Sequence, residues 1–151
     1  MFFMCMAAAY IFNIVGLIIN TIIGLIKWAD VLNPLTEVLD GSGVIATIIF
    51  VGILSPIIEE IVFRGVLLDK LRGYGDKTAI CFTALTFALF HGNLSQFFYA
   101  FVLGLFFGYI VIKTNTIWYA VILHIAINIL GSVIMPALAL SGNDILIGLS
   151  G

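Results

Sequence analysis

Long apolar runs alternate with short polar segments along the chain. A run of about 20 apolar residues can cross a bilayer as a helix, and apolar runs occupy residues 2–26, 44–68, 78–91, 96–112 and 116–134. Open strands would leave backbone groups without hydrogen bonds in lipid, and no run shows the two-residue alternation of a membrane barrel. The pattern predicts an all-α, polytopic transmembrane bundle of about five spans with its active site within the membrane.

The polar segments mark where these helices end. Lys27 and Trp28 stand where anchors at the membrane interface are common, and residues 92–95 mark a break between the third and fourth spans. The apolar tail beyond Pro136 is too short to span a bilayer. The N-terminus lacks a basic segment, so we expect a retained helix and not a cleaved signal peptide.

The composition fits a surface that is solvated by lipid. Hydrophobic residues make up 63% of the 151 residues, charged residues make up 9%, and the mean hydropathy is +1.26. A soluble domain has roughly 25% charged residues. The length predicts a single transmembrane domain over residues 1–151. The net charge of -2 and the lack of a basic patch give no indication of nucleic-acid binding.

The few basic residues predict an orientation. Arg64, Lys70, Arg72 and Lys77 lie around the connection between the second and third spans, and Lys113 lies between the fourth and fifth. In a chain with five spans these two connections are on the same side. Basic residues favour the cytoplasmic side, so we expect both connections on the cytoplasmic side of a cell membrane.

Five ionisable residues fall inside the apolar runs: Glu59, Glu60, Arg64, His91 and His124. A charged group at this depth is costly unless it is paired, so it marks a candidate functional site. The two histidines are the only ones in the chain. The residues that carry chemistry are therefore concentrated in three of the predicted spans.

Helical spacing arranges these residues into pairs. Glu60 and Arg64 are four residues apart and can form an ion pair on one helix face. Glu59 is rotated by about 100° from Glu60, so it has no such partner in its own helix and is available as a general base or acid. Pro56 removes a backbone hydrogen bond to the carbonyl of Gly52, and a loosened turn there would admit water beside Glu59.

Two further pairs with the same spacing are Phe87 with His91 and His124 with Asn128. Counted from the predicted helix ends, Glu59 and His124 lie about 13 and about 12 Å deep, so they can meet. His91 comes out at about 21 Å, which requires a tilted third helix or one that starts further down. Each pair alone has a structural explanation: a histidine can be packed, an ion pair can be structural, and Phe87 can belong to the core.

Together the polar faces favour hydrolysis. A carboxylate can take a proton from water, a histidine can hold that water or protonate a leaving amine, and a histidine beside an asparagine can donate to an oxyanion. No serine shares a motif with a histidine. A zinc site of Glu59, His91 and His124 is an alternative, although the fused HExxH motif is absent.

The motifs are EExxxR at Glu59-Glu60-Ile-Val-Phe-Arg64, FxxxH at Phe87-Ala-Leu-Phe-His91 and HxxxN at His124-Ile-Ala-Ile-Asn128. In this order, within residues 55–128, they resemble the CPBP family of type II CAAX prenyl endopeptidases. That family also includes the bacterial proteins of bacteriocin self-immunity and lysostaphin resistance, which are called Abi proteins. Each motif alone is weak, and three in separate apolar runs are a specific signal. Residues 55–128 are therefore the predicted protease core.

The resemblance implies intramembrane proteolysis without a cofactor. It implies that Glu59 activates water with help from His91, and that His124 and Asn128 form the oxyanion hole. Glu60 and Arg64 would shape the site. The substrate would be a peptide or a membrane-protein segment in the lipid bilayer. The family usually has further helices before the EExxxR helix, so the chain is either a minimal member or part of a longer protein.

Two other classes of function compete with this one. The first is a non-enzymatic immunity or binding protein on the same scaffold. The second is a small transporter or proton relay, since buried carboxylates and histidines also serve such proteins. The lack of an internal repeat or of paired broken helices weakens the transporter hypothesis.

Overall fold

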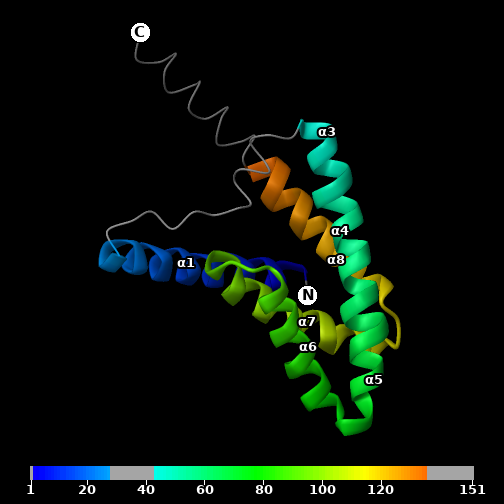
Figure 1. Cartoon of the computed structure of the whole chain (residues 1–151). Coiled ribbons are helices and arrows are strands. Elements are labelled where there is room, and N and C mark those ends of the chain that lie inside the picture. Colours follow the sequence, from blue (N-terminus) through cyan, green and yellow to red (C-terminus); the bar gives the residue numbers. More distant parts are fainter. Residues whose placement is uncertain (1, 28–42, 136–151) are drawn as a thin grey trace.

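The computed structural model describes residues 2–27 and 43–135, and this part of the chain consists of helices joined by short turns, without strands (Figure 1). The prediction of an all-α membrane bundle is confirmed. The main helices are α1 (Phe2–Lys27), a long helix over Val44–Tyr74, α6 (Asp76–Phe90), α7 (Leu94–Thr114) and α8 (Trp118–Ile129), which continues into η4 (Leu130–Ile134). The predicted polar loop after Trp28 and the tail beyond Pro136 lie outside the described residues.

The long helix is not wound uniformly. Its consecutive segments are α3 (Val44–Ala46), η1 (Thr47–Leu54), α4 (Ser55–Glu60), η2 (Ile61–Leu68), α5 (Asp69–Leu71) and the 3₁₀ turn η3 (Arg72–Tyr74). Both η1 and η2 are π-helical, whereas α4 is a regular α-helix with Pro56 near its start. Proline is tolerated in the first turn of an α-helix, so the ring fits there. The two glutamates follow directly, at the end of α4.

Short turns separate the helices after Tyr74. Gly75 and Gly92 have φ angles of 101° and 66°, which side chains rarely adopt, and they end the long helix and α6. The side chain of Asn93 caps α7 by accepting a 2.8 Å hydrogen bond from the backbone N–H of Gln96. These turns place α6 and α7 side by side, and both helices contact the η2 part of the long helix.

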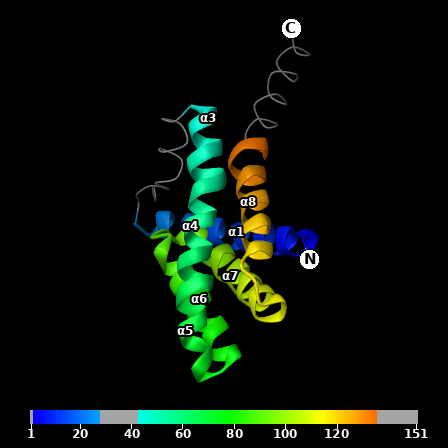
Figure 2. The same ribbon diagram turned by 90° about the vertical axis from the view of Figure 1, so that its right-hand side faces the viewer.

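Among the described residues, three helices are long and apolar enough to cross a membrane: Phe2–Ile26, Val44–Tyr74 and Leu94–Thr114. The apolar helix Trp118–Ile134 is shorter, and α6 has 15 residues. The expected end of the second span near Leu68 was wrong, because the helix continues to Tyr74. Measured from the turn at Gly75, Glu59 and His91 are each about 15 residues deep, which removes the mismatch in depth. The turn between α5 and α6 projects beyond the turn between α7 and α8 (Figure 2).

Small residues allow α6 and α7 to approach closely, as the spacing of Gly104 and Gly108 predicts. A Cβ atom added at Gly104 would lie 2.9 Å from the Cα of Ala84. One added at Gly108 would lie 3.3 Å from the side chain of Ile80. This contact is of the kind that small residues make between membrane helices, and it fixes the position of α7 beneath the site.

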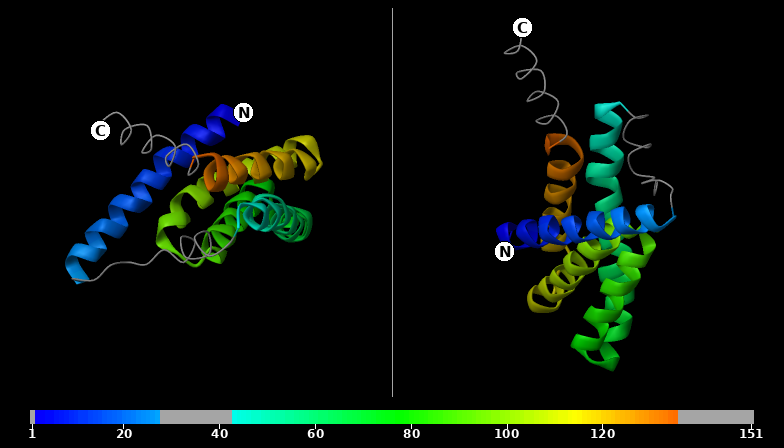
Figure 3. Two further views of the ribbon diagram at one scale, coloured as in Figure 1. Left: turned by 90° about the horizontal axis from the view of Figure 1, so that it is seen from above. Right: turned by 90° about the vertical axis from the view of Figure 1, so that its left-hand side faces the viewer.

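Helix α1 runs crosswise to the long helix and packs against α7 (Figures 1 and 3). Gly16 lies directly over α7, since a Cβ atom there would be 2.5 Å from the carbonyl oxygen of Ser95. The side chain of Asn20 donates a hydrogen bond to the Ser95 hydroxyl. The start of α7 is therefore held by α1 on one side.

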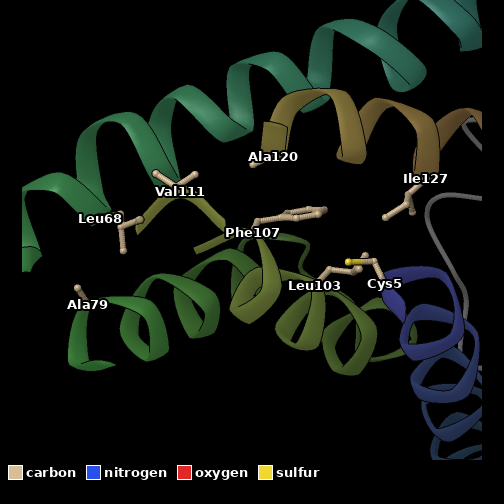
Figure 4. Close-up of a cluster of buried hydrophobic side chains, with 8 residues drawn as sticks. All are labelled: Cys5, Leu68, Ala79, Leu103, Phe107, Val111, Ala120 and Ile127. Atoms are coloured by element: carbon tan, nitrogen blue, oxygen red, sulfur yellow. The ribbon is translucent and has the colours of Figure 1, made fainter. Parts of the chain in front are cut away.

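A buried apolar cluster joins α1, α6, α7, α8 and the long helix (Figure 4). Phe107 lies in its middle and is fully buried, between Leu103 and Val111 on α7. Ala120 and Ile127 of α8 close the cluster on the other side. In a membrane the contribution of such a cluster comes from close van der Waals packing between helices, because lipid chains are as apolar as these side chains. The polar residues of the site lie next to this core.

Candidate active site

Glu60 is the buried centre of a three-residue contact between two helices. Its side chain is fully buried at the end of α4. Its Oε1 atom accepts hydrogen bonds from Nη1 of Arg64 at 3.0 Å and from Nδ1 of His124 at 2.9 Å. The predicted pair of Glu60 and Arg64 is therefore present, and its carboxylate also orients the histidine of α8.

Arg64 is enclosed on all sides by protein groups. Its Nη2 atom donates to the carbonyl oxygen of Gly104 at 3.3 Å. Its Cζ atom lies 4.3 Å from the ring centre of Phe87 and 5.3 Å from that of Phe107. A buried cation is tolerated when it is paired and hydrogen bonded, and the planar guanidinium also stacks on aromatic faces. Arg64 thus connects the long helix with α6 and α7.

Glu59 differs from its neighbour because it reaches a cavity. Its Oε1 atom accepts a hydrogen bond from the Ser55 hydroxyl, one turn earlier in the same helix. The expectation that Glu59 lacks a partner in its own helix was therefore incomplete, and the four-residue spacing of Ser55 and Glu59 was the signal that could have found it. Its Oε2 atom is buried, has no hydrogen-bond partner among the described residues, and lies 3.8 Å from Nε2 of His124.

The two ring nitrogens of His124 face different carboxylates. Because the carboxylate of Glu60 accepts, Nδ1 carries the hydrogen in that bond. The other nitrogen, Nε2, points toward Glu59. The ring is nearly buried, and the ring of Phe107 lies 5.2 Å away, centre to centre. His124 is thereby held in one orientation between Glu59 and Glu60.

Phe87 and His91 lie at the end of α6 and form the aromatic side of the site. Nδ1 of His91 donates to the carbonyl oxygen of Phe87 at 2.9 Å, which leaves Nε2 free to act as an acceptor. The Phe87 ring lies 4.8 Å from the ring of His91 and 5.7 Å from that of His124, centre to centre. Phe87 is therefore a core residue that also separates and orients both histidines.

Asn128 lies one turn after His124 on α8. Its Nδ2 atom donates a hydrogen bond of 3.1 Å to the carbonyl oxygen of Val51 in the π-helical segment η1. An amide side chain has two N–H hydrogens, so a second donor is available. The bond to Val51 ties the end of α8 to the long helix and sets the direction of that donor.

These residues meet in one small cavity of about 150 Å³. Glu59, His91, His124 and Asn128 line it, whereas Glu60 and Arg64 lie behind its wall. Four polar side chains in the same wall were not predicted from the sequence, namely Ser55, Gln96, Tyr99 and Ser132. Gln96 and Tyr99 are three residues apart in an apolar span, and this spacing was the available signal.

The zinc alternative would use Glu59, His91 and His124. No group of three histidine, cysteine, aspartate or glutamate side chains is close enough to hold a metal ion in the described residues 2–27 and 43–135. Nδ1 of His124 and Nδ1 of His91 are bonded to Glu60 and to a backbone carbonyl, so Nε2 is the nitrogen that each histidine could offer to a ligand. The zinc alternative stays a prediction.

The fold and the cavity define a class: an integral membrane protein made of apolar helices, whose carboxylates and histidines meet within the bundle. Over residues 41–130, more than half of its length, the chain matches the family described as type II CAAX prenyl endopeptidase Rce1-like. The chain belongs to this CAAX protease family. A search of curated proteins and a search of solved structures each found no match. Helix α1 lies outside the matched residues.

Proposed function

We propose that the chain is an intramembrane endopeptidase in which Glu59 activates the attacking water. The observation that carries the proposal is the Oε2 atom of Glu59, which is buried at the cavity without a protein hydrogen bond and 3.8 Å from Nε2 of His124. A buried carboxylate oxygen needs a donor, and a water molecule at this point would supply one. The position of the base, beside a cavity of about 150 Å³, suits a water and a peptide carbonyl.

The proposed reaction begins when Glu59 takes a proton from that water. The water oxygen attacks the carbonyl carbon of the peptide, and the carbonyl oxygen becomes an oxyanion. The second amide hydrogen of Asn128 donates to this oxyanion, as does His124 when its Nε2 atom also carries a proton. The proton held by Glu59 then passes to the leaving nitrogen, directly or through Nε2 of His91, and the C–N bond breaks.

Glu60 and Arg64 act as positioning residues in this mechanism. Glu60 holds Nδ1 of His124 and so aims Nε2 at the cavity. Arg64 neutralises Glu60 within the apolar core, where an unpaired carboxylate would be costly. Neither side chain lines the cavity, so their role is to keep the histidine in place.

The proposal includes catalysis without a resident metal. It is supported by the lack of a group of three metal-ligating side chains close enough to hold an ion among the described residues. The proposed setting is a bacterial cell membrane, with the basic connections around Arg72 and Lys113 in the cytoplasm. The substrate would be a peptide or a membrane-protein segment, and its cleavage would serve bacteriocin self-immunity or membrane peptide processing.

The test is a cleavage assay with the purified protein in detergent, using a peptide library and a prenylated peptide. We expect Glu59→Gln to lower the rate by about 10²–10⁴-fold, because the general base is removed. Asp69→Asn is the matched control, since this carboxylate is exposed on α5. A strong zinc chelator should leave the wild-type rate unchanged.

Three outcomes would contradict the proposal in different ways. Equal cleavage by the wild type and Glu59→Gln would exclude Glu59 as the base. Loss of activity with the chelator, restored by zinc, would favour the metal-dependent alternative. A folded wild type that cleaves nothing, but binds a bacteriocin equally well with or without Glu59→Gln, would favour a non-enzymatic immunity protein.

A further inference from the structure

A second, larger cavity adjoins the catalytic one. It has a volume of about 350 Å³ and lies between α1, the start of α7, and the end of α8 with η4. Four residues line both cavities: Gln96, Tyr99, Asn128 and Ser132. The two cavities are therefore neighbouring chambers that share a wall, and that wall includes the proposed oxyanion donor Asn128.

The volumes of the two chambers suit different contents. The catalytic cavity, at about 150 Å³, is below the size of ordinary ligand pockets, which begin near 300 Å³. The second cavity, at about 350 Å³, is within that range. The catalytic cavity can enclose a water and the reacting peptide group, whereas the side chains that flank the scissile bond need the additional space.

The walls of the second cavity indicate what would bind there. Its polar lining is divided between the wall that it shares with the catalytic cavity and three further residues, Tyr10, Asn13 and Ser95. The rest of the lining is apolar apart from Gly131, with Met6, Ala9, Leu17, Ile127 and Met135. Among the described residues that line the cavity, none is charged. A charged side chain buried there would therefore have no counter-ion, which is costly.

We propose that the second cavity binds an uncharged, apolar stretch of the peptide substrate on one side of the scissile bond, with α1 as the wall that determines specificity. This inference rests on the proposed endopeptidase function. The peptide backbone would pass the shared wall at Tyr99 and Asn128, and the apolar side chains would contact Met6, Ala9 and Leu17.

The position of α1 supports its assignment to specificity. The family match covers residues 41–130 and includes every residue proposed for the chemistry, but it excludes α1. Helix α1 is nevertheless seated firmly, through the close approach of Gly16 to the backbone of Ser95 and the hydrogen bond from Asn20. Its inward side chains are thus held at a defined distance from the shared wall.

The first experiment compares cleavage profiles over a peptide set in which each position near the scissile bond is Ala, Leu, Phe or Lys. Ala9→Phe reduces the cavity, so we expect at least a tenfold lower kcat/KM for Phe or Leu on one side of the bond and little change for Ala. Leu25→Phe is the matched control, because Leu25 is 72% exposed on the same helix and does not line the cavity. Lys at the sensitive positions should lower the wild-type kcat/KM at least tenfold.

A binding experiment separates this inference from the proposed chemistry. In the Glu59→Gln protein, a fluorescent peptide with apolar residues should bind at least tenfold more weakly when Ala9→Phe is added, and equally well with Leu25→Phe. If Ala9→Phe does not fold, Met6→Ala is used, and it should weaken binding of the same peptide. Unchanged binding and an unchanged cleavage profile would overturn the subsite, whatever the role of Glu59. Full activity of Glu59→Gln would overturn the chemistry and leave the binding result valid.

Discussion

Glu59 and Glu60 are adjacent and chemically identical, but they lie in different surroundings. Glu60 is fully buried, and one of its oxygens accepts from both Arg64 and His124. Glu59 faces the cavity and accepts from the Ser55 hydroxyl. Oε2 of each glutamate has no hydrogen-bond partner among the described residues, but of the two side chains it is Glu59 that lines the cavity. A rotation of about 100° along the helix is enough to produce this difference.

The comparison shows how one helical turn can supply both structure and reactivity. Paired carboxyl groups whose surroundings differ commonly divide the chemical roles of a site between them. Here the enclosed Glu60 stabilises the bundle, and the accessible Glu59 is left for chemistry. A substitution of Glu60 should therefore mainly lower the stability of the fold, whereas a substitution of Glu59 should mainly lower the cleavage rate.

The largest expected effect on stability is that of Glu60→Gln. This change leaves the guanidinium of Arg64 buried without a counter-charge, which should cost about 3–5 kcal/mol. Glu59→Gln should cost less than about 1 kcal/mol, because Glu59 makes one hydrogen bond, which an amide can still accept. Unfolding by denaturing detergent, followed by circular dichroism, measures both. Equal losses of stability would remove the distinction between the two glutamates.

A smaller effect is expected for Gly104→Ala, which disturbs the surroundings of Arg64 without changing a charge. The added methyl group would lie 2.9 Å from the Cα atom of Ala84, so α6 and α7 must separate. Overpacking of this kind costs about 1–3 kcal/mol. Gly73→Ala is the matched control, since no atom lies within 4 Å of its Cβ position. A neutral Gly104→Ala in the same unfolding assay would contradict the close contact.

The smallest effect is expected for Ser55→Ala, which acts on Glu59, the glutamate that lines the cavity. It removes the hydrogen bond to Oε1 of Glu59, and a hydrogen bond of about 1 kcal/mol corresponds to about fivefold in rate. We expect kcat to fall by about this factor and the free energy of unfolding to fall by no more than about 1 kcal/mol. Ser55→Thr keeps the hydroxyl and should restore the rate. If Ser55→Thr is as slow as Ser55→Ala, the hydroxyl does not position Glu59.

Local spacing predicted the contacts within single helices. The pair of Glu60 and Arg64, the pair of Phe87 and His91, and the approach of α6 and α7 at Gly104 all follow from residues three or four apart on a helix. Such contacts depend on helix geometry alone. Glu59 and His124 do meet, as predicted, although the depth of Glu59 was counted from Leu68 and the helix continues to Tyr74.

Contacts that depend on how helices are placed were not predictable in this way. The bond between Glu60 and His124 requires a rotation of α8 that hydrophobicity does not encode. The crosswise course of α1 and the cavity beside it have the same origin. The extension of the long helix to Tyr74 was missed because its last six residues include the charged Asp69, Lys70 and Arg72.

The uneven winding of the long helix has a consequence for mapping its lipid-facing surface. The buried residues of η1, Thr47 and Gly52, are five positions apart, whereas those of α4, Pro56 and Glu60, are four positions apart. A single helical wheel with 3.6 residues per turn would drift out of phase along this segment. Cysteine scanning or spin labelling of the helix should therefore be interpreted with a separate helical wheel for each of η1, α4 and η2. A one-residue deletion in η1 would rotate the Val44 end of the long helix without moving the glutamates.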